Sequence, residues 1–416
     1  MKETFYETEG DCRMNERIAL GFHTCVDYEL KWDTQVVEEQ IKAFDIHADE
    51  LKLDIEVDSE RAIWIMSLAH LQAGIGCEMV PSTSEVCIAF ANHFEYEVTL
   101  GGTPTRAGII LDRLGYSSVL QTSCYNDHVK RLLPSKIRAL PGVGPDQNKI
   151  YPHVVLQCHK GVRIQANDID FVTPRENRIL ISRDEDSLNM PVLPDEFGKM
   201  IGGCEVFLLG SFSELLDPDV LKDRMEKTKK LLSYLPDDAV VVMEDGCYVK
   251  KDFRSYVHRQ LAPQIDVLSM NEDELQQYIG KSIDILDPKA VEEAVKYVYD
   301  NSGIKLILVH SAAWALVYGE NAGTMKASLE GGVTMASTRF RIGDNFTPED
   351  YEQTKDIPVK TKSAAFCDCM GERLGEKIYC IPCKDLSYVE NPTVVGLGDS
   401  FAGGLLPGLL KENRRN

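Results

Sequence analysis

The pattern of apolar and polar residues differs between the first and the second half of the chain. In the second half, short and nearly continuous apolar runs alternate with longer stretches whose apolar residues recur at helical spacing. We expect strands at residues 206–210, 239–243, 265–270 and 304–309, and helices at 217–232, from 272, at 290–301 and at 400–410. Buried apolar strands that alternate with helices indicate a parallel sheet covered by helices on both faces.

The first half of the chain combines strands and helices of this kind with shorter strands. Longer elements are expected as a strand at residues 18–22 running into 23–27, helices at 35–53, 59–71 and 106–114, and a strand at 116–122. Short strands between polar turns, at residues 154–158, 163–166 and 178–183, predict a second and smaller sheet. We therefore predict an α/β fold: a doubly wound large domain formed by residues 1–28, 101–140 and 203–416, and a smaller β-containing lid formed by insertions at 29–100 and 141–202.

Charge and cysteine content narrow the class of protein. Acidic residues outnumber basic ones, 66 against 45, which gives a formal net charge of −21. Such a surface repels phosphate-rich partners, so we expect neither nucleic acid nor a membrane as a partner. The 12 cysteines are scattered through apolar stretches, and the polar N-terminus lacks a signal-peptide pattern. These features predict a cytoplasmic protein.

Four cysteines near the C-terminus have a spacing that is compatible with a zinc site: Cys367, Cys369, Cys380 and Cys383. Residues 377–383, however, have the pattern of a strand, and buried free cysteines behave as small apolar residues. A structural role is therefore the simpler interpretation, and zinc binding is the alternative.

The segment with the most chemical content is a glycine-rich turn at residues 396–399. An extended stretch leads into Gly396, Leu397, Gly398 and Asp399, and small residues then open a helix. Glycines let main-chain amides approach a phosphate closely, and the helix N-terminus adds positive potential. An aspartate at this point can accept the proton of an attacking hydroxyl. The alternative is an ordinary glycine turn capped by an aspartate.

The chain resembles the ADP-dependent glucokinase/phosphofructokinase group of the ribokinase-like superfamily. The resemblance covers most of the chain and is carried by the turn at 396–399 and by residues 21–27 (GFHTCVD), 101–102 (GG), 173–178 (TPRENR), 270–275 (MNEDEL), 308–311 (LVHS) and 337–344 (STRFRIGD). It implies a ribokinase-like fold and a kinase that uses ADP, releases AMP and phosphorylates a sugar or sugar phosphate of the glucose or fructose 6-phosphate type.

The resemblance also implies roles for individual residues. Asp399 would be the catalytic base, and the amides of Gly396, Leu397 and Gly398 would form the anion hole. Asp27 would bind sugar hydroxyls next to a substrate turn at Gly101 and Gly102. Asn271 and Glu274 would order Mg²⁺ and its waters, since Mg²⁺ keeps several waters and takes few carboxylates. The acidic first turn of a helix capped by Asn271 is the alternative for this last pair.

Three departures from the family pattern concern the site. His23 stands where the family usually has Asn, and residues 103–106 (TPTR) replace a small Gln-Ala-Gly run after the two glycines. Both changes are expected to line the acceptor site. Glu244 stands in a segment that lacks the family's His, which leaves its role as a metal ligand open.

Other polar residues point to different acceptors. Glu78 falls where glucose-using members carry a Glu, and a carboxylate there would bind a hydroxyl and repel a phosphate. Arg175 and Arg178 could instead bind a substrate phosphate, because guanidinium matches phosphate geometry. Surface acids and ordinary ion pairs are the alternatives. His310 is expected to contact the nucleotide or to be a satisfied strand-end histidine.

The sequence thus predicts an ADP-dependent sugar kinase. An ATP-dependent sugar or nucleoside kinase of the same superfamily is one alternative. A sugar or nucleotide sensor that keeps the fold without catalysis is another, although the turn glycines and Asp399 argue against it.

Overall fold

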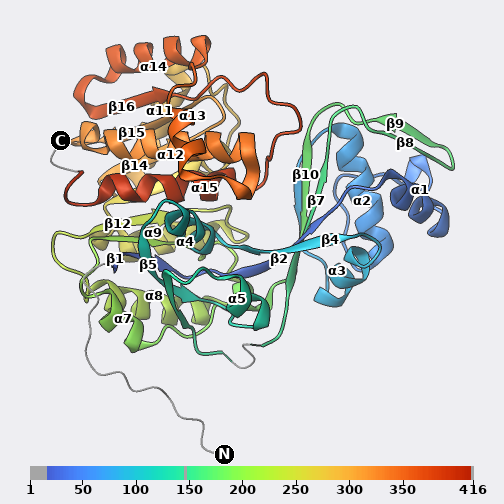
Figure 1. Cartoon of the computed structure of the whole chain (residues 1–416), viewed down its shortest axis with the longest axis horizontal. Helices are drawn as coiled ribbons and strands as arrows, with labels where there is room; N and C mark the ends of the chain where they lie inside the picture. Colours follow the sequence, from blue (N-terminus) through green and yellow to red (C-terminus); the bar gives the residue numbers. More distant parts are fainter. Residues whose placement is uncertain (1–15, 145–147, 414–416) are drawn as a thin grey trace, which may run out of the picture.

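The chain forms two β-sheets of different size, each with its own hydrophobic core. The computed structural model describes residues 16–144 and 148–413. Figure 1 shows the large unit on one side and the smaller unit, with its sheet and helices, on the other. The two sheets have nine and five strands, and a two-stranded ribbon extends from the smaller unit.

The nine-stranded sheet has the order β16-β15-β14-β13-β12-β11-β1-β5-β6. Its strands from β14 to β6 run parallel, while β15 and β16 add an antiparallel edge. The strands are β1 (Glu16–Gly21), β5 (Ser117–Thr122), β6 (Ile137–Pro141), β11 (Val206–Leu209), β12 (Val240–Glu244), β13 (Val267–Asn271), β14 (Leu306–His310), β15 (Trp314–Gly319) and β16 (Ile378–Pro382).

Helices cover both faces of this sheet, as the alternating pattern predicts. One face packs against α4 (Thr103–Arg113), α12 (Lys326–Ile342) and α15 (Leu397–Leu405). The other packs against α7 (Asp195–Ile201), α8 (Pro218–Leu232), α9 (Lys251–Leu261), α10 (Glu272–Ile279), α11 (Pro288–Ser302) and α14 (Thr361–Leu374). The predicted doubly wound α/β fold is confirmed.

The five-stranded sheet has the order β3-β10-β7-β2-β4. Its strands are β2 (Cys25–Leu30), β3 (Cys77–Met79), β4 (Tyr96–Gly101), β7 (Pro152–Cys158) and β10 (Asn177–Ile181), and β8 (Arg163–Ala166) pairs with β9 (Ile169–Val172). Helices α1 (Thr34–Ala43), α2 (Glu60–Ala73) and α3 (Ser84–Ala91) join it in a separate core around Trp64 and Phe90. Burying these large rings gives the small unit a stable interior of its own.

The chain crosses between the two sheets at four places. The crossings lie between β1 and β2, between β4 and α4, between β6 and β7, and after β10. The short helices α5 (Asp127–Leu132) and α6 (Glu185–Asn189) lie close to these connections, and α13 (Pro348–Lys355) packs on α12. Because the crossings join the two sheets, they position side chains between them.

Some element boundaries differ from the sequence prediction. The helix expected at residues 35–53 ends at Ala43, because Asp45 adopts a left-handed conformation (φ 47°) and a short 3₁₀ turn (Ala48–Glu50) follows. The expected domain boundary after residue 28 falls within β2, which belongs to the small sheet. The division of the chain into two domains stays a prediction. Across residues 16–144 and 148–413, no helix combines the length and apolarity that a membrane span requires.

Candidate active site

A cavity of about 440 Å³ opens between the two sheets. Strand ends of the large sheet and side chains of the small one both line it, which is the usual ligand position in open α/β folds. Of the residues predicted for the site, the cavity wall includes Asp27, Glu78, Gly102, Arg178, Glu244, Asn271, Glu274, His310, Gly396, Leu397, Gly398 and Asp399. Gly101 and Arg175 are not part of this wall.

The glycine turn begins α15 at the wall of the cavity. Gly396 caps the helix in a left-handed conformation (φ 67°), which glycine adopts without strain. The first intrahelical hydrogen bond runs from the Ser400 amide to the Gly396 carbonyl, so the preceding amides have no partner within the helix. The turn therefore offers main-chain donors and the positive end of a helix dipole to an anion in the cleft.

Asp399 lies in the first turn of α15 with its carboxylate toward the cavity. Its side chain is 23% exposed, and the Thr103 hydroxyl donates a 2.6 Å hydrogen bond to Oδ1. The other oxygen, Oδ2, is 3.7 Å from Nε of Arg106. One oxygen is thus fixed by Thr103, and the other faces the cleft beside a cation.

Arg106 is a buried cation that pairs with two carboxylates, one of which, Asp27, is a predicted substrate-binding residue. It donates to Asp27 at 2.7 Å and to Glu29 at 3.2 Å. Burial opposes its charge, but Asp27, Asp399 and Glu29 outweigh burial and hold the pKa of Arg106 above its usual value. Arg106, from the altered segment at residues 103–106, therefore engages Asp27 directly.

A second buried guanidinium lies beneath the turn. Arg339 on α12 donates to the Val395 carbonyl at 2.7 Å and pairs with Asp344. Burial and the nearby charge of Arg106 lower the pKa of Arg339 to about 10. Two cations therefore flank residues 396–399.

Histidines and an aspartate form a polar network at the acceptor end of the cleft. Asp184 accepts hydrogen bonds from His153 at 3.1 Å and from the Ser187 hydroxyl at 3.0 Å, and Ser187 contacts Nε2 of His23 at 2.8 Å. Burial disfavours a charged His153, yet Asp184 outweighs it and raises the pKa of His153 to about 9. His23 thus lines the cavity, and its contact with an acceptor stays a prediction.

Three carboxylates lie near one another at the end of β12 and the start of α10: Glu244, Asp245 and Glu274. Asn271 caps α10: its side chain accepts from the amides of Asp273 and Glu274, while Glu274 accepts from the Asn271 amide at 2.8 Å. Burial and the charges of Glu244 and Asp245 raise the pKa of Glu274 well above its usual value. Among the described residues, Oε2 of Glu244 is buried without a hydrogen-bond partner. This donor set suits a divalent cation, although the Asn271 side chain is largely used by the cap.

His310 lies under the glycine turn. Its ring stacks on Phe401 with centroids 4.5 Å apart, and its Nε2 is 3.7 Å from Glu244 Oε1. A Cβ added at Gly398 would be 3.5 Å from the His310 ring. The structure therefore places His310 close to the phosphate-binding turn and the acidic group.

A conserved sequence region covers residues 16–406 of this chain, and it defines the ADP-specific phosphofructokinase/glucokinase family. The chain belongs to this family. Its relatives include an ADP-specific phosphofructokinase of Pyrococcus horikoshii, 21% identical over 93% of this chain and 96% of that protein. An ADP-dependent glucose/glucosamine kinase of Pyrococcus furiosus is 22% identical over 73% of this chain and 68% of that protein.

Solved structures agree with this family membership at the level of the fold. An ADP-dependent kinase in complex with fructose-6-phosphate and ADPβS superimposes with a TM-score of 0.73. The alignment covers 97% of this chain and 96% of that one, at 14% identity. The fold of that ADP-dependent kinase is therefore present along nearly the whole chain.

Glu78 and Arg178, which the sequence analysis assigns to different acceptors, form an ion pair with each other. Arg178 donates to Glu78 at 2.9 Å across neighbouring strands β10 and β3, and both side chains are substantially exposed. Arg175 donates to the Gly74 carbonyl, so its guanidinium is engaged outside the cavity wall. Of the two predicted phosphate-binding arginines, only Arg178 lies at the cavity.

The C-terminal cysteines do not gather into one group of metal ligands. Cys380 lies on β16, the predicted strand, with its sulfur 3.1 Å from that of Cys367, and Cys383 contacts the Ser311 carbonyl. Among the residues that the structure describes, one group of three His, Cys or acidic side chains has its possible ligand atoms close together. That group is His23, Cys25 and His153, and it contains none of the C-terminal cysteines. The structural interpretation of these cysteines fits their positions.

Sequence reasoning did not single out His153 and Asp184 of the cavity wall, or Arg339 beside the glycine turn. His153 and Asp184 come together from β7 and the segment after β10, and Arg339 reaches the turn from α12. The available signal was indirect: Asp184 follows a predicted short strand, and Arg339 lies in a segment that carries the family resemblance. Neither position reveals its partner, because the partners are far apart in the sequence.

Proposed function

We propose that this protein transfers the terminal phosphoryl group of ADP to a hydroxyl of a sugar or sugar phosphate and releases AMP. One observation carries the proposal: the carboxylate of Asp399 faces the cavity beside the unpaired amides that begin α15. A base and a row of anion donors thus meet at one point. Membership of the ADP-specific family supports ADP over ATP as the donor.

In this mechanism Asp399 accepts the proton of the acceptor hydroxyl. The Thr103 hydroxyl holds Oδ1, which leaves Oδ2 toward the cleft for the incoming proton. The amides of Gly396, Leu397 and Gly398 stabilise the transferred phosphoryl, and the Arg106 and Arg339 guanidiniums add positive potential nearby. The wall contributed by the small sheet limits access of water, which restricts hydrolysis of the nucleotide.

The acidic group formed by Glu244 and Glu274, with Asn271 beside it, would hold Mg²⁺. The unpaired buried oxygen of Glu244 and the raised pKa of Glu274 both favour a cation at this place. When bound with the nucleotide, Mg²⁺ neutralises phosphate charge. His310 lies between these carboxylates and the turn and would contact the phosphate side of the nucleotide.

The acceptor end favours a ligand with several hydroxyl groups. Asp27, His23, His153 and Asp184 supply carboxylate and imidazole groups for hydroxyl recognition, and Gly102 leaves room beside them. Arg178 is the cation available to a phosphorylated sugar, and Glu78 is its partner. We therefore propose a glucose-type or a fructose 6-phosphate-type acceptor. We also propose that the enzyme acts in the cytoplasm.

A donor and acceptor panel tests this function. ADP, ATP and GTP are each combined with hexoses, hexose 6-phosphates and nucleosides in the presence of Mg²⁺, and AMP, ADP or GDP formation is measured. We expect acceptor-dependent formation of AMP from ADP. Turnover with ATP in place of ADP, or ligand binding without turnover with any donor, would overturn the proposal.

A further inference from the structure

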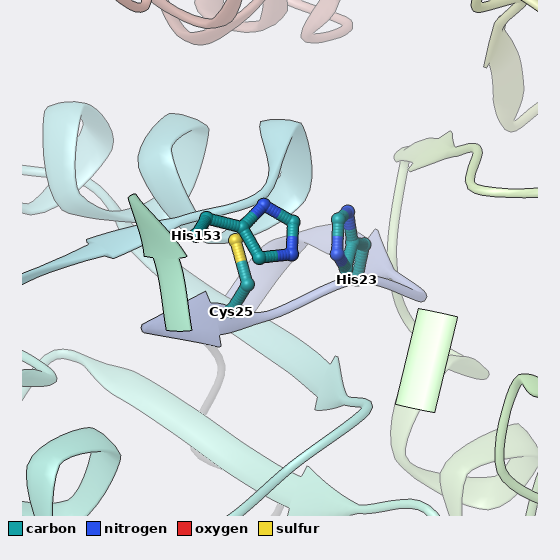
Figure 2. Close-up of side chains that lie close together, drawn as sticks. All are labelled: His23, Cys25 and His153. Carbon is teal, nitrogen blue, oxygen red and sulfur yellow. The ribbon is translucent and has the colours of Figure 1, made fainter. Parts of the chain in front are cut away.

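Two histidines and a cysteine come together at the acceptor end of the cleft. His23 lies in the connection between β1 and β2, Cys25 begins β2, and His153 lies on β7. One ligand atom from each lies within 4.8 Å of the other two. Figure 2 shows the two imidazole rings side by side, with the Cys25 sulfur directed toward them.

The sheet itself produces this grouping. Strands β2 and β7 are parallel neighbours, with Asp27 opposite His153 in the register. Side chains two residues apart on a strand share a face, so Cys25 and Asp27 lie on the same side as His153. The connection before β2 then brings His23 onto this side, within ring-to-ring contact of His153 at 5.9 Å.

The adjacent glycines leave space for this cluster. A Cβ at Gly102 would be 2.7 Å from the His23 carbonyl and 3.2 Å from its ring. A Cβ at Gly101 would collide with Asp27 and would be 2.6 Å from the Cys25 sulfur. The pair of glycines therefore accommodates the three side chains, and Gly101 acts here without belonging to the cavity wall.

Negative charge surrounds the three side chains. Asp184 accepts from His153 at 3.1 Å, and its Oδ2 is 3.9 Å from Nε2 of His23. The thiol of Cys25 donates to Asp27 at 3.3 Å, and the charge of Glu214 acts on both histidines. Buried carboxylates that orient imidazoles are the usual outer partners of a metal bound by histidine.

We propose that His23, Cys25 and His153 bind a divalent transition-metal ion of the zinc class, at a site distinct from the proposed Mg²⁺ ligands Glu244, Asn271 and Glu274. A thiolate with two imidazoles favours Zn²⁺ over Mg²⁺, because Mg²⁺ prefers oxygen ligands. Asp184 serves as the orienting carboxylate. The site does not depend on which phosphoryl donor the enzyme uses.

This site has a consequence for the acceptor. Three protein ligands leave a tetrahedral ion with one open position, and all three residues belong to the cavity wall. An oxygen or nitrogen atom of the acceptor can therefore complete the coordination. Acceptor recognition in this chain then combines a metal ion with the carboxylate of Asp27.

Cobalt spectroscopy tests the site without relying on activity. The full-length protein is stripped of metal with a chelator and titrated with Co²⁺ alone, and the near-ultraviolet absorption that marks a thiolate-to-cobalt bond is recorded. We expect one Co²⁺ per chain with this absorption, which Zn²⁺ then displaces. A wild-type protein that shows no such absorption overturns the proposal, whatever the variants do.

Matched variants identify the ligands. Cys25→Ser should remove the thiolate absorption, whereas Cys124→Ser, at another buried cysteine that contacts the Thr24 carbonyl, should retain it. Asp184→Asn should keep the absorption and weaken Co²⁺ affinity by about 10- to 100-fold. Absorption that persists in Cys25→Ser, or that is lost in Cys124→Ser while the fold is intact by circular dichroism, contradicts the assignment.

Discussion

Asp399 lies at the cavity wall in the first turn of α15, with Oδ1 bonded to Thr103 and Oδ2 beside Arg106. Asp399→Asn keeps the shape and the bond from Thr103 but removes the proton acceptor. We expect kcat to fall by about 10²- to 10⁴-fold. Calorimetric affinity for ADP should stay close to that of the wild type, because the amides of the turn remain.

The matched control for this change is Asp217→Asn. Asp217 caps α8 at an exposed position away from the cavity wall, and Asn is an equally good cap. This variant should retain wild-type turnover and stability. An Asp399→Asn enzyme with normal kcat would show that another group accepts the proton.

Arg106 contributes to stability as well as to the acceptor region. It is buried and pairs with Asp27 and Glu29, so removing its charge leaves the buried Asp27 and the partly buried Glu29 without their cation. We expect Arg106→Met to lower the free energy of unfolding by about 3–5 kcal/mol in urea titrations. Adding Asp27→Asn should recover part of this loss. Strictly additive losses would contradict a direct pairing of the two residues.

Individual side chains divide into those that sequence could identify and those that it could not. Asp399 and its neighbouring glycines are contiguous, so the chemistry of one turn is readable from spacing alone. The pairing of Arg106 with Asp27 joins residues 79 positions apart, and that of His153 with Asp184 joins residues 31 apart. Spacing does not specify such contacts, because they depend on the register of strands in the folded sheet.

The junction of β4 and α4 gives a test at the scale of an element. Gly102 and Gly115 both have a positive φ, 88° and 93° respectively. A Cβ added at Gly102 would meet His23, whereas a Cβ added at Gly115 would have nothing within 4 Å. Gly115→Ala should therefore cost about 1–2 kcal/mol of backbone strain. Gly102→Ala should cost more in thermal or urea unfolding and should also reduce activity by displacing His23. Equal losses in the two variants would show that the junction tolerates a side chain.

The neighbouring strands β3 and β10 carry the pair Glu78 and Arg178. An exposed ion pair contributes about 0–1 kcal/mol, so Arg178→Met should leave stability nearly unchanged. For a phosphorylated acceptor we expect a higher KM in Arg178→Met and a lower KM in Glu78→Gln, because the first loses a cation and the second loses a repelling charge. Steady-state kinetics with paired hexose and hexose 6-phosphate acceptors measures this. An unchanged KM for both acceptors would place Arg178 outside acceptor binding.

Most elements of the large sheet were predictable because each strand is a buried apolar run. Residues 206–210 and 239–243, for example, correspond closely to β11 and β12. The end of α1 was not predictable from periodicity, since Asp45 interrupts a pattern that otherwise continues in the sequence. The order of strands in either sheet was also not predictable, because neighbours such as β1 and β11 are distant along the chain.

At the scale of the whole molecule, ligands should draw the two sheets together. The cavity wall takes residues from both, so a bound nucleotide and acceptor would contact both at once. We expect small-angle X-ray scattering to show a smaller radius of gyration with AMP and acceptor together than without ligand. The Asp399→Asn variant with ADP and acceptor is a useful second sample, because turnover is slow. An unchanged radius in both samples would indicate that the cleft is already closed.

The four crossings between the sheets make acceptor preference unusually free to evolve. His23, Thr103 and Asp184 lie on or next to these connections, while the cores around Trp64 and beneath the large sheet involve other residues. Mutations at these three positions can therefore change the substrate range while leaving both cores intact, whereas Gly101 and Gly102 of the same crossings are constrained by close contacts. Mutant libraries aimed at new phosphorylation products are best concentrated at these three positions.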